Sequence, residues 1–171
     1  LQGNAPENFV LYRISRDIGN PAPLSLTLAE IPFSVDQQAV RSVAIWCSAE
    51  GPVMSEGSVI VPMRFAQQDG NVSSVETFFR TIEQDARAVN PAAFANIRGW
   101  YDPHWKEYNL LLPSGTGQTL CNLWLCCDLQ QRKWFKKVPT VYPQMVVTVR
   151  DLQGVTYPYA GLDTGHLVRL E

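Results

Sequence analysis

Histidine is scarce in this sequence, because its 171 residues include only His104 and His166. Histidine is the side chain that most often transfers protons in enzymes, and the sequence holds neither a G-x-S-x-G nor an H-E-x-x-H motif. The segment 113–118 (PSGTGQ) is glycine-rich but lacks the lysine and the following helix of a phosphate-binding loop, so we interpret it as a hairpin tip. We therefore expect no catalytic residue, no metal and no cofactor, in a protein that is not an enzyme.

Cysteine is also sparse, and its spacing does not suit a metal site. Two of the four cysteines, Cys126 and Cys127, are adjacent, and adjacent side chains on a strand point to opposite faces. Such a pair cannot easily share one zinc ion. We expect Cys47, Cys121, Cys126 and Cys127 to be buried free thiols; the alternative is a disulfide between Cys47 and one of the other three.

Charge of either sign is low, and no apolar run is long. The chain has 14 Lys and Arg against 16 Asp and Glu, a net charge of -2, which argues against a dedicated nucleic-acid-binding protein. No apolar run approaches the ~20 residues that span a bilayer, so we expect no membrane span. With 46% hydrophobic residues, the sequence has enough apolar material for a core, and its length predicts one domain over residues 1–171.

Proline, glycine and aromatic residues are plentiful, which is typical of many short strands joined by tight turns. Leu24, Leu26 and Leu28 illustrate the period of two that predicts a half-buried strand, because they would share one face. We predict an all-β, mainly antiparallel fold. The predicted strands cover residues 9–14, 24–28, 40–47, 53–54, 58–62, 94–101, 107–112, 123–127, 133–138, 145–150, 155–159 and 166–170.

One segment departs from this pattern. Between residues 73 and 89 the apolar positions recur at steps of three and four, which places them along one stripe of a helix. Ser73 and Glu76 match a capping box, and Asn90-Pro91 supplies a stop signal. The spacing therefore predicts one inserted amphipathic helix of about four turns near 73–89, with its stripe packed on the core.

Several turn glycines, strand-end aspartates and tryptophans resemble the blade pattern of β-propeller-like structural proteins from tailed bacteriophages. The resemblance covers roughly residues 40 to 171, and its motifs lie at 44–51 (AIWCSAEG), 90–94 (NPAAF), 97–102 (IRGWYD), 108–113 (YNLLLP), 122–128 (NLWLCCD), 132–134 (RKW) and 159–170 (YAGLDTGHLVRL). A closed propeller needs four or more blades, and this chain offers about three. We therefore expect either part of a longer propeller or an array that does not close alone.

The resemblance implies a non-enzymatic structural component of the virion, in the tail or the head-to-tail region, assembled in the host cytoplasm. Its partners would be other virion proteins and further copies of itself, held by the packing of blade edges and hairpin tips in a symmetric ring. The resembling motifs are fold markers, so they identify no catalytic residue.

Two surface features suggest other functions. The aromatic residues Trp100, Tyr101, Trp105 and Tyr108 surround a predicted turn and could stack on a host-surface glycan or anchor a receptor, which makes a carbohydrate-binding or receptor-binding module the alternative function. Arg132, Lys133, Lys136 and Lys137 form a basic patch with interleaved aromatic residues, which we interpret as a solvated outer strand rather than a nucleic-acid groove.

Paired carboxylates would allow a third function, glycoside hydrolysis. Four aspartates lie at predicted strand ends or turns, where this residue type commonly hydrogen-bonds the backbone. We therefore interpret them mainly as turn residues. They are Asp102, Asp128, Asp151 and Asp163.

Overall fold

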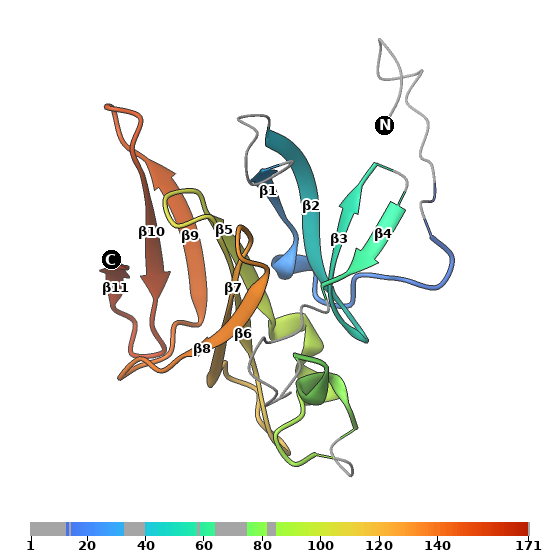
Figure 1. The fold of residues 1–171 in the computed structure, drawn as a ribbon. Coiled ribbons are helices and arrows are strands. Elements are labelled where there is room, and N and C mark those ends of the chain that lie inside the picture. Colours follow the sequence, from blue (N-terminus) through green and yellow to red (C-terminus); the bar gives the residue numbers. More distant parts are fainter. Residues whose placement is uncertain are drawn as a thin grey trace, which may run out of the picture.

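Three antiparallel sheets lie side by side in the molecule (Figure 1). The structure is a computed structural model, and it describes residues 13, 15–32, 40–57, 59–63, 75–81 and 85–170. The mainly antiparallel β fold predicted from the alternating pattern is confirmed. Apart from Arg13, the predicted strand 9–14 lies outside the described residues.

Each sheet is a meander of consecutive strands, and several of the described connections contain a glycine with a positive φ or an aspartate that caps the turn, as predicted. The first sheet contains β1 (Thr27–Pro32), β2 (Val40–Ser48), β3 (Gly51–Glu56) and β4 (Val59–Pro62). The second contains β5 (Arg98–Asp102), β6 (Glu107–Leu112), β7 (Leu123–Asp128) and β8 (Lys133–Lys137). The third contains β9 (Met145–Arg150), β10 (Thr156–Gly161) and β11 (Leu167–Arg169).

The sheets meet through their first strands. In each sheet the first strand is an edge strand, and β5 contacts both β1 and β9. The second sheet therefore lies between the other two, with one face toward each (Figure 1). Among the described residues this array does not close into a ring.

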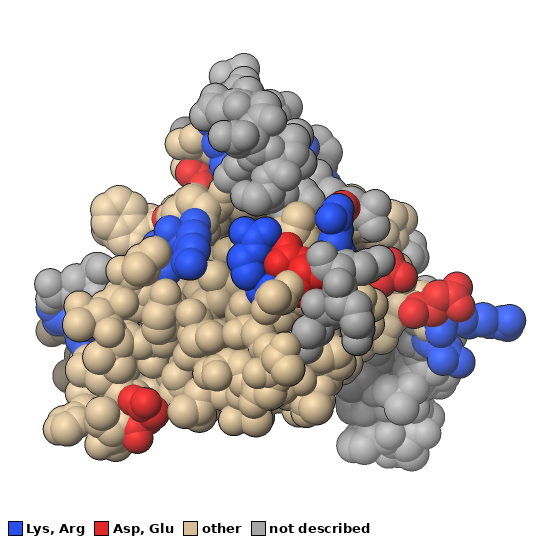
Figure 2. Space-filling view, turned by 90° about the horizontal axis from the view of Figure 1, so that it is seen from below, with Lys and Arg blue, Asp and Glu red and all other residues tan. Residues whose placement is uncertain are grey.

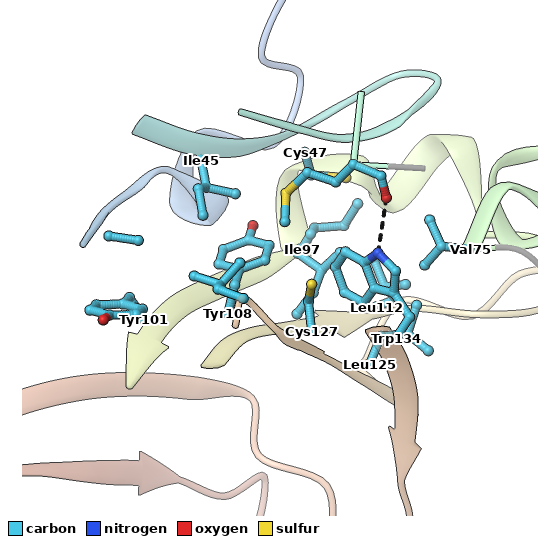
Figure 3. Close-up of a cluster of buried hydrophobic side chains, with 14 of the residues drawn as sticks. Ile45, Cys47, Val75, Ile97, Tyr101, Tyr108, Leu112, Leu125, Cys127 and Trp134 are labelled. Carbon is cyan, nitrogen blue, oxygen red and sulfur yellow. Dashed lines mark hydrogen bonds between the residues drawn. The ribbon is translucent and has the colours of Figure 1, made fainter. Parts of the chain in front are cut away.

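A large apolar core fills the space between the first and second sheets (Figure 3). Ile45 and Cys47 of β2 face Tyr108 of β6 and Cys127 of β7 across this space. The polar groups of the aromatic residues in this core have hydrogen-bond partners. The Tyr108 hydroxyl donates to the Ser25 carbonyl at 3.0 Å. The Trp134 indole N–H likewise donates to the Met63 carbonyl at 2.9 Å. Burying a polar group without such a partner would be costly, so these bonds allow the aromatic residues to lie inside.

The predicted strand over 24–28 begins later than expected. A 3-10 helix, η2 (Pro23–Ser25), precedes β1, so only Leu28 of the three leucines lies in the strand. Leu24, Leu26 and Leu28 are 47%, 55% and 72% exposed. Ser25 is buried instead, because its hydroxyl donates to the Ala22 carbonyl and accepts the N–H of Cys47. The leucines are therefore exposed rather than half-buried.

The predicted helix over 73–89 is not confirmed. Its described part contains a 3-10 helix, η3 (Val75–Phe79). Further along, the Asp85 carboxylate accepts the backbone N–H of Arg87, and the N–H of Val89 donates to the Phe78 carbonyl at 2.7 Å. Val89 also forms a β-bridge with Ser114. Side-chain capping and pairing with a distant loop thus take the backbone groups that a continuous helix would use.

The segment after Asn90 also differs from its prediction. Residues 94–101 were predicted as one strand, but a second 3-10 element, η4 (Pro91–Asn96), occupies its beginning and β5 starts only at Arg98. Asn90 caps η4 by accepting the N–H of Ala92. None of the helices in the described ranges is long and apolar enough to cross a membrane.

Candidate functional site

A cleft of about 410 Å³ opens between the second and third sheets. It lies on the face of the second sheet that points away from the large core, where three tryptophans gather. We call it the tryptophan cleft. Its lining residues are Trp100, Asp102, His104, Trp105, Asn109, Trp124, Lys137, Val155, Thr156, Tyr157, Pro158, Arg169 and Leu170.

Two tryptophans form the floor of the tryptophan cleft. Trp100 of β5 and Trp124 of β7 are both mostly buried, and their ring centroids lie 5.4 Å apart at an interplanar angle of 54°. The Trp124 indole N–H donates to Asn109 Oδ1 at 2.8 Å. This bond fixes the orientation of the Trp124 ring, because a buried indole N–H needs an acceptor.

The turn between β5 and β6 forms one rim. Asp102 Oδ1 accepts the backbone N–H groups of His104 and Trp105 at 2.9 and 3.3 Å. Lys106 follows with a φ of 57°, which closes the turn. The His104 ring packs edge-on against Trp105 at 4.8 Å between centroids, and Trp105 is 60% exposed. The turn therefore holds a large aromatic surface at the mouth of the cleft.

Charged groups complete the opposite parts of the lining. The Lys137 ammonium forms an ion pair with Glu107 at 2.7 Å and lies 5.4 Å from the centroid of the Trp124 ring. Arg169 lies over the Tyr157 ring at 4.9 Å. The cleft thus offers flat aromatic faces, a carboxylate, an amide and two cations, a combination suited to binding a polar ligand that has an apolar face.

The structure separates the four aromatic residues that the sequence singled out. Trp100 and Trp105 line the cleft, whereas Tyr101 and Tyr108 lie in the large core. The Tyr101 hydroxyl donates to the Glu30 carbonyl at 3.0 Å, and burial raises the pKa of Tyr101 to about 12. Burial also raises the pKa of Tyr108 well above its usual value. Alternation along β5 causes this division, because Trp100 and Tyr101 must point to opposite faces.

The predicted basic patch is also divided between faces. β8 is the outer strand of the second sheet; Trp134 is buried, Phe135 and Lys136 are exposed, and Lys133 and Lys137 are half-buried. Lys137 lines the cleft, while Arg132 occupies the preceding turn with a φ of 56°. Figure 2 shows Lys and Arg side chains interspersed with Asp and Glu along a band, beside a broad area without charge.

Two further strand-end aspartates, Asp128 and Asp151, accept backbone hydrogen bonds within turns. Asp128 Oδ1 accepts the N–H groups of Gln130 and Gln131, and Asp151 Oδ1 accepts the N–H of Val155. Together with Asp102, these residues follow the interpretation as turn residues. In the described part of the chain no group of three or more His, Cys, Asp and Glu residues could hold a metal ion.

The four cysteines are buried free thiols, as the sequence predicted. Burial is the main cause of their raised pKa values, and it raises the pKa of Cys121 to about 11. Cys126 and Cys127 point to opposite faces of β7, because Cys127 pairs with Tyr108 while Cys126 pairs with Asn109. Thiols with such raised pKa values are protonated near neutral pH and react slowly.

A second kind of candidate site covers the two ends of the array. We call the three exposed leucines at the start of the first sheet, Leu24, Leu26 and Leu28, the leucine face. The outer side of the third sheet carries five apolar or aromatic residues, which we call the β9 face. They are Met145, Val147, Val149, Tyr159 and Leu167. Val147, for example, is 52% exposed.

Sequence reasoning missed Asn109 and Trp124 as lining residues. The alternation of β5, β6 and β7 could have placed them, because Trp100, Asn109 and Cys126 share one row, while Leu111 and Trp124 share the next. It could not place Val155, Thr156 and Pro158, since their approach depends on how two separate sheets pack. Alternation predicts which face of a sheet carries a given side chain, but it does not predict which other sheet packs against that face.

Comparison of the chain with protein families, curated proteins and solved structures found no match.

Proposed function

We propose that this chain is a non-enzymatic structural component of a bacteriophage particle, in the tail or the head-to-tail region, and that it acts through subunit packing. The observation that carries the proposal is the pair of apolar faces at opposite ends of the array, the leucine face and the β9 face. The three sheets would be three consecutive blades of a propeller-like assembly, since each begins at the strand that contacts the neighbouring sheet.

The exposed apolar residues support packing rather than isolation in water. Single exposed apolar side chains are ordinary, but contiguous apolar patches on folded proteins usually mark interaction sites. The β9 face is contiguous, because Met145, Val147 and Val149 follow one another on the same side of β9 and Val147 pairs with Tyr159. Fully burying one such valine or leucine contributes about 1.5–3 kcal/mol, so a partner that covers the face gains considerable binding free energy.

Antibodies against the full chain test this role on intact particles. Phage particles purified from the source of the sequence are labelled with gold-conjugated antibody and viewed by electron microscopy, with antibody pre-absorbed on the purified chain as the control. We expect label at the tail or at its connection to the head. Particles that lack the chain, both by label and by mass spectrometry of their proteins, would overturn the proposal.

A second candidate function is carbohydrate binding in the tryptophan cleft. The exposed Trp105 ring at the cleft mouth favours it, because the turn held by Asp102 presents this ring beside polar groups. A sugar could stack its apolar face on the ring and hydrogen-bond to His104 at its edge.

A glycan array with the purified chain tests this second function. If the cleft binds glycans, Trp105→Ala should abolish the signal, whereas Leu152→Ala, a substitution at an exposed turn residue outside the cleft, should leave it unchanged. A signal that persists in Trp105→Ala would exclude the cleft as the glycan site.

A further inference from the structure

We propose that two copies of this chain bind head to tail, with the leucine face of each copy against the β9 face of the other, and close a ring of six sheets. This inference rests on the proposed function of subunit packing and names the partner as a second copy. Each dimer would contain two identical contacts related by a two-fold axis. Three lines of argument lead to this arrangement.

The first argument is continuity with the contacts inside one chain. The molecule already contains two head-to-tail contacts, one from the first sheet to the second and one from the second to the third. Along β5, Tyr101 faces the preceding sheet and Trp100 faces the following one. The array therefore has a direction, and each sheet has a preceding and a following face.

The two free faces fit this direction. On β1, Ala29 is buried toward the second sheet, so Leu28 points to the preceding side, where the described residues place no further sheet. On β9, Val146 packs toward the second sheet, so Val147 points to the following side. The β9 face of one copy can thus meet the leucine face of another as a third contact in the same series.

The second argument is chemical complementarity. Both faces are apolar, so a contact between them removes hydrophobic side chains of both copies from water.

The third argument is closure. A contact between two different faces generates either a closed ring or an open filament. Closed propellers typically contain about four to eight sheets around a central axis. One copy supplies three sheets and two copies supply six, whereas three copies would supply nine. Two copies therefore give the closed ring that falls within the known range.

Sedimentation equilibrium and native mass spectrometry of the full chain test the proposal. We expect a species with twice the mass of one chain. Leu28→Arg, on the leucine face, and Val147→Glu, on the β9 face, should each weaken the dimer at least tenfold. The control is Val138→Glu, which alters an exposed valine after β8 and away from both faces, and it should leave the dimer intact.

Mixing the two variants separates loss of contact from loss of folding. A mixed dimer of Leu28→Arg and Val147→Glu chains has one unaltered contact and one contact that joins arginine to glutamate. We expect native mass spectrometry to show dimers with one chain of each variant, because each variant keeps the face that the other has lost. Failure of mixed dimers to form from two folded variants would overturn the proposal.

Several other results would contradict the six-sheet ring. A monomer at every concentration tested, a larger filament, or a dimer that neither substitution weakens would each overturn the six-sheet ring. These outcomes leave the proposed function separately testable, because a monomer in solution can still be labelled in phage particles. Conversely, a dimer whose chain is absent from the particles would retain the ring and overturn the structural role.

Discussion

The two inter-sheet contacts of this molecule differ in kind. Between the first and second sheets, a large buried cluster includes aromatic residues whose polar groups are satisfied inside it. Between the second and third sheets, the fully buried cluster is small and contains Trp100, Leu111, Cys121 and Trp124, and a cleft opens beside it. In both places the sheets contact each other through their first strands. One contact is nevertheless a filled core, whereas the other leaves an accessible cleft.

This comparison indicates where stability and binding reside. The filled contact between the first and second sheets contributes most to the free energy of unfolding, because truncating a buried side chain there removes many packing contacts. A face that keeps a cleft has fewer such contacts, but it exposes aromatic surface that a ligand can use. We therefore expect substitutions in the large core to act mainly on stability and those around the cleft to act mainly on binding.

The largest effect should come from Gly99→Ala. A Cβ atom at this position would lie 2.7 Å from the Ser25 carbonyl oxygen and 2.7 Å from the Tyr108 hydroxyl. The methyl group would therefore push η2 away from β5 and break the Tyr108 hydrogen bond. We expect a loss of about 3 kcal/mol or more in urea unfolding. A change below about 1 kcal/mol would show that this close approach can relax.

Neighbouring leucines on β6 compare the two contacts directly. Leu110 and Leu111 are both fully buried, but Leu110 belongs to the large core and Leu111 to the small cluster. Replacement by alanine should cost about 2–5 kcal/mol, with Leu110→Ala near the upper end because its surroundings cannot collapse. Leu111→Ala should fall near the lower end. Equal losses in urea unfolding would contradict the distinction.

Alkaline pH should act through the buried thiols. Their pKa values are raised in the folded state, so the unfolded chain binds fewer protons above its ordinary thiol pKa of about 8.5. Stability is then complete below about pH 8.5 and falls as pH rises, by up to about 1.4 kcal/mol per unit for each thiol. For Cys121 this loss should end near pH 11.

Unfolding curves measured across this pH range check the alkaline effect, and alkylation provides a second measurement. Cys121 should react with iodoacetamide before Cys47, since burial raises the Cys47 pKa further. Faster alkylation of Cys47, located by mass spectrometry, would contradict the greater protection that we assign to the large core.

The smallest effect should come from Lys137→Met at the cleft. This substitution removes the ion pair with Glu107 but keeps much of the apolar stem that contacts the aromatic rings. Because the pair is partly exposed, we expect a loss of at most about 1 kcal/mol, and a smaller difference from wild type at high salt. Urea unfolding at low and high ionic strength measures both. A loss that does not depend on salt would show that packing, rather than charge, dominates.

Much of this fold could be predicted from local sequence. Alternation and turn residues gave both ends of β6 and of β9 correctly, because these signals depend on a few adjacent residues. The same pattern could not show that Leu24, Leu26 and Leu28 are exposed, since that choice depends on Ser25 accepting hydrogen bonds from the distant Cys47 N–H and Tyr108 hydroxyl. The period within 73–89 indicated a helix, but distant pairing at Val89 takes its backbone groups.

The candidate site was less accessible to sequence reasoning than the strands. Trp100 and Trp105 could be singled out because they surround one turn, and both line the tryptophan cleft. Tyr101 and Tyr108 were grouped with them, although strand alternation already requires Trp100 and Tyr101 to separate. The cleft itself arises where two sheets pack incompletely, a property that no single segment encodes.

The order of strands has a consequence for how this polypeptide acquires its structure. Every sheet is built from neighbouring hairpins, so each can begin to form from a short stretch of chain before the next stretch emerges from the ribosome. The third sheet, whose strands all follow residue 144, would be the last to dock. Synthesis can therefore add the sheets stepwise from the amino terminus, and the larger core can form once β8 has left the ribosome, before the third sheet docks.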